Sequence, residues 1–227
     1  MAALATSLKR AVLCAALLLC ASAGGAMPDE AAERQLIVSA INGNIDGVRQ
    51  ALKNGASINV RDNRGRTPLL IATHADNVEM ARALIAAGAD VNARDHIEDS
   101  PYLYAGAEGR NEILRMTLEA GADLRSTNRY GGTALIPAAH HGHPETVAIL
   151  LRTRIDKDHV NKLGWTALLE AVILGDGGPT HTEVVRLLVE AGANVKLTDR
   201  EGVTPLQHAR RRGFREMVRI LEARGGN

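Results

Sequence analysis

Apolar residues recur at helical spacing through most of the chain, between short polar turns. In the segment Arg64–Asp95 they fall on one face of a helix. These positions are Val78, Ala81, Leu84 and Ile85. A shorter helix is predicted ahead of them, because Thr67 can cap its first turn and Pro68 loses no hydrogen bond at the first helical position. Gly88 suits the left-handed residue that ends a helix. The segment therefore predicts a short helix, a tight loop, a longer helix and a turn.

This unit recurs along the sequence. Its Thr-Pro-Leu start is found again, with small substitutions, at intervals of 33, 33, 33 and 38 residues. The positions are Thr67, Ser100, Thr133, Thr166 and Thr204. An alanine follows each of them five residues later, and a Gly-Ala pair keeps the same spacing with the same excess in one interval. Two markers that agree in this way indicate a repeat array. Helix pairs this short cannot bury their apolar face alone, so neighbouring pairs must stack.

The 33-residue unit, with Thr-Pro-Leu, the later alanine and Gly-Ala-Asp-Val-Asn, resembles the ankyrin repeat family from about Ala31 to the C-terminus. The resemblance implies an all-α solenoid of about six stacked helix pairs, with hairpin-like finger loops projecting to one side. It also implies a concave face built from the finger tips and the exposed ends of the first helices. The expected repeats are about 29–62, 63–95, 96–128, 129–161, 162–199 and 200–227.

Two repeats depart from the pattern. Pro137 lies in the first turn of the leading helix of the fourth repeat and should distort it. The fifth repeat carries an insertion, residues 174–181, which we expect to form a loop between its two helices. Gly177, Gly178 and Pro179 prevent helix continuation there.

The first residues do not fit the repeat. Lys9 and Arg10 precede an apolar run over residues 11–20, and small residues follow it. This order predicts a secretory signal peptide that is cleaved after Ala23 or Ala26. We therefore expect a periplasmic or secreted protein.

Residues 1–26 are thus assigned to the signal peptide and residues 27–227 to the repeat domain. A membrane anchor is the alternative, but the apolar run is short for a bilayer span. A lipid-modified cysteine is a third option, which is disfavoured because leucine precedes both Cys14 and Cys20. After cleavage we expect no stable membrane insertion.

Composition excludes several classes of function. Both cysteines lie in the predicted signal peptide, so the mature chain would hold no disulfide, thiol nucleophile or cysteine metal site. The full chain has a net charge of +1, and removal of Lys9 and Arg10 changes it to −1. A surface this close to neutral gives no long-range attraction to nucleic acid. We expect no cofactor.

Histidines form the densest cluster of potentially reactive groups. His140, His141 and His143 lie close to His159, and such a cluster could hold a metal ion or act in acid–base catalysis. The resemblance favours a structural interpretation, because His143 and His181 occupy the position of a loop histidine in the Gly-His-x-Glu phrase of ankyrin repeats. We therefore predict no catalytic or metal site. A metal-dependent hydrolase that uses His140 and His141 is kept as an alternative.

The repeat register gives a set of candidate partner-binding residues on the concave face. They are Arg64, Arg66, His74, Arg129, Tyr130, His140, His141, Lys162, Leu163, Trp165, Ile173 and Leu174. Trp165 and Tyr130 stand among apolar neighbours on a surface otherwise rich in cations, which is the composition of an interface hot spot. Local packing of Trp165 against the next finger is the alternative.

We therefore predict a non-enzymatic, monomeric protein–protein interaction module that is exported. It would bind a folded protein on its concave face to protect, inhibit or scaffold it. A purely structural spacer is the remaining alternative.

Overall fold

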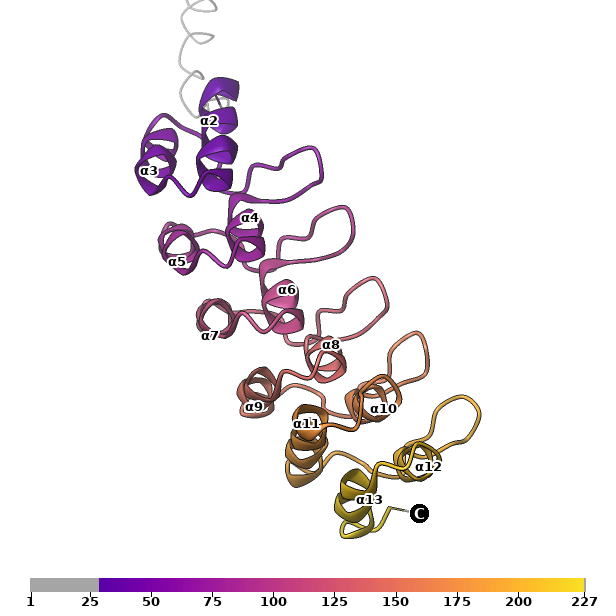
Figure 1. Cartoon of the computed structure of the whole chain (residues 1–227). Coiled ribbons are helices and arrows are strands. Elements are labelled where there is room, and N and C mark those ends of the chain that lie inside the picture. Colours follow the sequence, from indigo (N-terminus) through magenta and orange to yellow (C-terminus); the bar gives the residue numbers. More distant parts are fainter. Residues whose placement is uncertain (1–28, 227) are drawn as a thin grey trace, which may run out of the picture.

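Paired helices stack in a single row, and loops project from one side of it (Figure 1). The computed structural model describes residues 29–226, and within that range every regular element is a helix. The inner helices, next to the loops, are α2 (Glu30–Ile41), α4 (Pro68–His74), α6 (Pro101–Ala107), α8 (Leu135–His140), α10 (Ala167–Ile173) and α12 (Pro205–Arg211). The outer helices are α3 (Ile45–Lys53), α5 (Val78–Ala86), α7 (Asn111–Glu119), α9 (Pro144–Leu151), α11 (Pro179–Glu190) and α13 (Arg215–Glu222). The predicted all-α solenoid of six helix pairs with finger loops is confirmed.

None of the helices between residues 29 and 226 combines the length and apolar character needed to cross a membrane. The predicted signal peptide and its boundary with the repeat domain lie outside the described residues.

Side-chain caps start most of the inner helices, as the Thr-Pro-Leu pattern predicts. The Thr67 hydroxyl accepts a hydrogen bond from the Leu70 amide at 3.2 Å, and Pro68 fills the first position. Ser100 and Thr166 cap α6 and α10 in the same way. Each cap satisfies an amide that has no partner within the helix. Four of the five Thr or Ser positions therefore cap an inner helix in the same way, and α8 is the exception.

Pro137 causes that exception. In α4 the amide four residues after the threonine donates to the Thr67 carbonyl at 2.9 Å, whereas Pro137 has no amide at this register position. The Ile136 amide instead donates to the Thr133 carbonyl at 3.1 Å, which forms a tighter turn. The buried Thr133 hydroxyl is left without a hydrogen-bond partner, and α8 is the shortest inner helix. The predicted distortion is confirmed.

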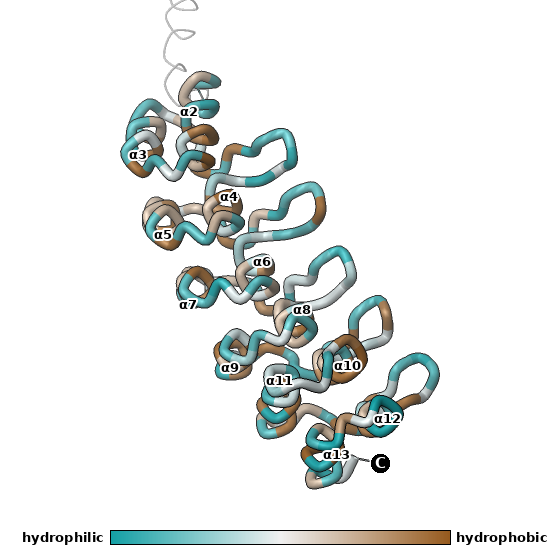
Figure 2. Tube along the Cα trace, viewed as in Figure 1, coloured by the Kyte–Doolittle hydropathy of each residue, from teal (hydrophilic) through white to brown (hydrophobic). Residues whose placement is uncertain are grey.

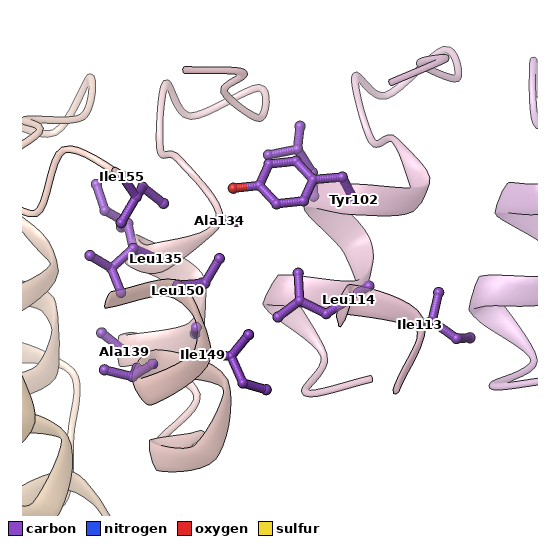
Figure 3. Close-up of a cluster of buried hydrophobic side chains, with 14 of the residues drawn as sticks. Tyr102, Ile113, Leu114, Ala134, Leu135, Ala139, Ile149, Leu150 and Ile155 are labelled. Carbon is purple, nitrogen blue, oxygen red and sulfur yellow. The ribbon is translucent and has the colours of Figure 1, made fainter. Parts of the chain in front are cut away.

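The core runs continuously through the stack, because each helix pair buries its apolar residues against its neighbours. Figure 3 shows Tyr102, Leu114, Leu135 and Leu150, from four successive helices, in one cluster. The alanines at the shared register position of the inner helices are completely buried. They are Ala72, Ala105, Ala138, Ala171 and Ala209. Figure 2 shows that the finger loops are mainly hydrophilic, whereas α10 is strongly apolar.

The insertion of the fifth repeat is only partly a loop. Residues 174–178 connect α10 to α11, but Pro179 begins α11 and residues 179–181 form its first turn. The predicted loop over residues 174–181 is therefore too long. Proline disfavours continuation of a preceding helix, yet it is well suited to the first position of a new one. The loop also packs against the last helix pair, since a Cβ atom on Gly177 would overlap the Phe214 ring.

Replacement of Gly177 tests this packing, and Gly202 is a matched control. The two glycines have φ angles of +74° and +75°, but nothing lies within 4 Å of a Cβ on Gly202. Gly202→Ala should cost about 1 kcal/mol of unfolding free energy for the left-handed backbone alone. Gly177→Ala should cost about 1–3 kcal/mol more, because the Phe214 ring must move. Urea denaturation of both variants measures the difference, and equal costs would show that the loop is not packed.

Candidate functional site

One Asp or Asn holds the base of each finger, five residues before the threonine or serine that precedes the next inner helix. Its Oδ1 atom accepts hydrogen bonds from the amides two and four residues later, at 2.8–3.1 Å. The residues are Asp62, Asp95, Asn128, Asn161 and Asp199. We call this arrangement the finger latch. It fixes the shape of each finger and leaves the second side-chain atom free for other contacts.

Those other contacts differ between repeats. The second oxygen of Asp62 lies 2.7 Å from the Arg66 guanidinium, and that of Asp199 lies 2.6 Å from Nε2 of His208. In the fifth repeat the latch is Asn161, and its Nδ2 donates to Oε1 of Glu170 at 2.8 Å. At these three positions the latch thus contacts a different side chain.

A groove of about 450 Å³ lies on the concave face, between the fingers of repeats three to five and the inner helices behind them. Its walls carry several exposed apolar side chains. Ile97, Tyr130, Leu163 and Leu174 are between 42% and 53% exposed. Asp99, Glu108 and Arg129 contribute charges around them. The groove therefore combines an apolar surface with a charged rim.

Glu170 lies in the lining of the groove and is only 5% exposed. Burial raises the pKa of its carboxyl to about 7, although the hydrogen bond from Asn161 acts in the opposite direction. His140 Nδ1 lies 3.7 Å from Oε2 of Glu170, beyond hydrogen-bond distance. Burial, together with His141 and His181, lowers the pKa of His140. Near neutral pH the imidazole is therefore uncharged and gives the carboxylate no counter-charge.

Aromatic and cationic groups on the groove are held by one another. The Arg129 guanidinium lies 4.8 Å from the centre of the Tyr130 ring and 3.8 Å from the Asp99 carboxylate. His74 stacks on Tyr104 with a centroid distance of 3.9 Å. Burial lowers the pKa of His74, whose Nε2 atom is buried without a hydrogen-bond partner. These contacts hold Arg129, Tyr130, His74 and Tyr104 in place in the lining of the groove.

Seven of the twelve candidate residues line this groove. They are His74, Arg129, Tyr130, His140, His141, Leu163 and Leu174. Arg64 and Arg66 lie instead on a separate hollow beside α2. Lys162, Trp165 and Ile173 are not part of the groove lining; the Lys162 ammonium donates to the Arg129 carbonyl at 3.0 Å.

Trp165 does not stand out from the surface as the aromatic pattern suggested. It is half-buried, and its amide and carbonyl both bond to the latch residue Asn161. The exposed aromatic side chain of this region is Tyr130, with Leu163 from the next finger.

Sequence reasoning missed Glu170, which is the most deeply placed charge of the groove. A signal was present in the repeat register. Glu170 occupies the position that holds Ile71, Tyr104 and Pro137 in the preceding repeats, so it is an acid where two repeats have a large apolar side chain. The latch residue Asn161 was missed for the same reason, because its role depends on that carboxyl.

The histidine cluster is occupied by structural contacts. The His141 Nδ1 atom lies 2.8 Å from the Ala107 carbonyl, and the His181 Nε2 atom lies 2.9 Å from the His140 carbonyl. The His143 ring covers Gly109. Across residues 29–226, no three His, Cys, Asp or Glu side chains converge in a way that could hold a metal ion.

Comparison with known proteins agrees with this architecture. The family profile described as "Ankyrin repeats (3 copies)" matches residues 4–95 and 102–199, and "Ankyrin repeats (many copies)" matches residues 179–222. The chain belongs to the ankyrin repeat family. Ankyrin repeat domains are in general protein–protein interaction modules.

Solved ankyrin repeat structures superpose over most of the chain. An ankyrin repeat domain from Acinetobacter baumannii AYE (ABAYE2397) is 55% identical with a TM-score of 0.82, and covers 85% of this chain and 98% of its own. The ankyrin repeat protein EF0377 is 42% identical with a TM-score of 0.81, and covers 86% and 98%. The ankyrin repeat domain of Bcl-3, a member of the IkappaB family, is 29% identical with a TM-score of 0.76, and covers 85% and 86%.

Curated relatives match over shorter stretches. The ankyrin repeat protein YahD of Escherichia coli (strain K12) is 50% identical over 56 residues, which are 25% of this chain and 28% of YahD. The potassium channel KOR1 of Oryza sativa subsp. japonica is 58% identical over 40 residues, which are 18% of this chain and 5% of the channel. The chain therefore spans less than a third of either relative.

The buried carboxyl makes a pH-dependent contribution to the stability of this ankyrin domain. The pKa of Glu170 rises from 4.5 to about 7 on folding, so the folded state favours the neutral acid. Its stabilising contribution is complete below about pH 4.5 and is lost as the pH rises toward 7. Glu170→Gln keeps an acceptor for Asn161 without the charge. The free energy of unfolding of the variant relative to wild type should increase by about 2 kcal/mol between about pH 5 and pH 8.

Urea titrations of both proteins across this pH range provide the measurement. Glu108→Gln is a matched control, since it removes a half-exposed carboxylate from the same groove. A constant difference between Glu170→Gln and wild type would show that the Glu170 carboxyl titrates normally.

Proposed function

We propose that this chain is an exported, non-enzymatic binding module that holds a folded protein in its concave groove. Such binding would protect, inhibit or scaffold the partner. One observation carries the proposal: Tyr130, Leu163 and Leu174 form an exposed apolar group at the centre of a groove with a charged rim.

An exposed apolar group of this kind costs solubility unless it is covered in use. An apolar centre with a polar rim is the usual anatomy of a protein interface, and tyrosine is enriched among the residues that dominate binding energy. A spacer that only separates other domains would not need these side chains. The groove is also supported on rigid helices and latched fingers, so little order must be gained when a partner binds.

Binding should depend on Tyr130 and Leu163 and leave stability unchanged. Replacement of either by Ala should weaken the complex by about 2 kcal/mol, because each removes apolar area from the centre of the interface. Both side chains are about half exposed, so the thermal midpoint should stay close to that of wild type.

A photoreactive residue at Leu163 identifies the partner to be used in this titration. The same residue placed at Arg82, which is exposed on α5 of the outer row, is the control. A protein that is captured from Leu163 and not from Arg82 supports the proposal. Equal capture at both positions, or full-strength binding after both alanine replacements, would place the interface elsewhere.

If the protein is exported, its signal peptide should be removed. The mature protein should begin at Gly24 or Met27 and be recovered outside the cytoplasm, because the basic, apolar and small-residue order directs cleavage there. N-terminal sequencing of the protein from its native cell is the measurement. A soluble cytoplasmic protein with Met1 intact would contradict export.

A further inference from the structure

Glu170 is buried in the groove, and no lysine or arginine between residues 29 and 226 forms an ion pair with it. Its Oε1 accepts one hydrogen bond, from the neutral amide of Asn161, and the basic group beside Oε2 is the uncharged His140 at 3.7 Å. A carboxylate removed from water in this way is costly unless a positive charge compensates it.

Nearby basic side chains are committed to other groups. His208, at the same register in α12, is bound to Asp199, and the Arg129 guanidinium pairs with Asp99 and Tyr130. The Arg212 guanidinium donates to the carbonyls of Val172 and Ile173. On the other side of Glu170 the register position holds Pro137, which has no polar side chain. Among the described residues, the stack thus brings no charged donor to this carboxyl.

We infer that the groove receives a basic side chain of the protein partner, an arginine or a lysine, and that Glu170 is its counter-charge. The inference rests on the proposed function and adds the chemistry of the partner to it. The groove lining holds three carboxyl groups, those of Glu170, Asp99 and Glu108, and one arginine, Arg129, which is already paired with Asp99, so a partner with an acidic side chain is disfavoured.

The walls suit the rest of such a side chain. Pro137, Leu163 and Leu174 offer apolar surface to the methylene groups of a lysine or arginine, while the charged end reaches Glu170. Tyr104 and Tyr130 also line the groove, where one face of each ring is covered, by His74 and by the Arg129 guanidinium. The groove therefore suits a single lysine or arginine side chain that is flanked by apolar residues of the partner.

Binding of the cation should depend on pH, because only the ionised form of Glu170 carries the counter-charge. The groups that face Glu170 are His140 on α8, Asn161 at the finger base and the His208–Asp199 pair on the α12 side, with Glu108 and Asp99 across the groove. A cation binds the ionised carboxylate, so affinity should fall as the pH falls through about 7. The expected loss between about pH 8 and pH 6 is about tenfold.

Random-sequence peptides displayed on phage provide the probe. Peptides are selected on the purified protein, and those that also bind Leu163→Gln, which replaces part of the apolar wall with a neutral polar side chain, are discarded. The remaining peptides should share an arginine or lysine flanked by apolar residues. Their dissociation constants should rise at least about tenfold on Glu170→Gln, because one member of a desolvated charge pair is lost. Glu79→Gln, which removes an exposed carboxylate from the outer helix α5, is the matched control and should change them little.

The outcomes separate the inference from the proposed function. Groove-dependent peptides without a basic residue, or with equal affinity for Glu170→Gln, would overturn the inference and leave the proposed function standing. Peptides that all bind Leu163→Gln as tightly as wild type would overturn both. Spermidine, a free small cation, is tested as a competitor. If it displaced every selected peptide and bound more tightly than any of them, the occupant of the groove would be a small-molecule cation and not a protein side chain. If the affinity of Glu170→Gln fell equally between pH 8 and pH 6, the pH dependence would not come from Glu170, and its role as the counter-charge would be overturned.

Discussion

Each helix pair of this chain can bury its apolar residues only against the pairs on either side of it. The inner helices are six to seven residues long after the first repeat, and their shared alanine positions are completely buried. Small side chains there let successive helices approach closely, and that approach sets the distance between one finger and the next. The spacing of every side chain on the concave face follows from it. The groove exists because four repeats are held in that register, and no single repeat contains it.

The finger latch divides each repeat into a constant and a variable part. One oxygen of Asp62, Asn161 or Asp199 closes the finger in the same way every time, and the second atom is available to a neighbour that differs between repeats. In the fifth repeat this second atom supports Glu170 with a neutral amide. An aspartate at the same position would have placed two carboxylates in contact in a buried site, which is strongly unfavourable.

Local rules were sufficient to predict the fold from the sequence. The repeat period, the helix starts and the distortion at Pro137 depend on residues close together in the chain, and the structure confirms them. The loop at 174–181 was predicted too long because a proline that ends one helix can also begin the next. The candidate site was predicted only in part, because exposure depends on neighbours from other repeats. Trp165 and Tyr130 both belong to the predicted finger positions, one and three residues before the threonine, yet Tyr130 is exposed and Trp165 is half-buried. Glu170 becomes a buried, unpaired acid only once Pro137 and His208 are known to flank it.

Pro137 distinguishes α8, the inner helix of the fourth repeat, from the other inner helices. Thr133 cannot cap α8, so the inner helix behind the groove starts with fewer hydrogen bonds than its counterparts α4, α6, α10 and α12. The groove lining includes Ile136, Pro137 and His140 of this helix together with residues of the repeats on either side of it. A partner that binds there would contact the weakly capped helix and its neighbours together, and its binding energy would add to the free energy of unfolding of the array.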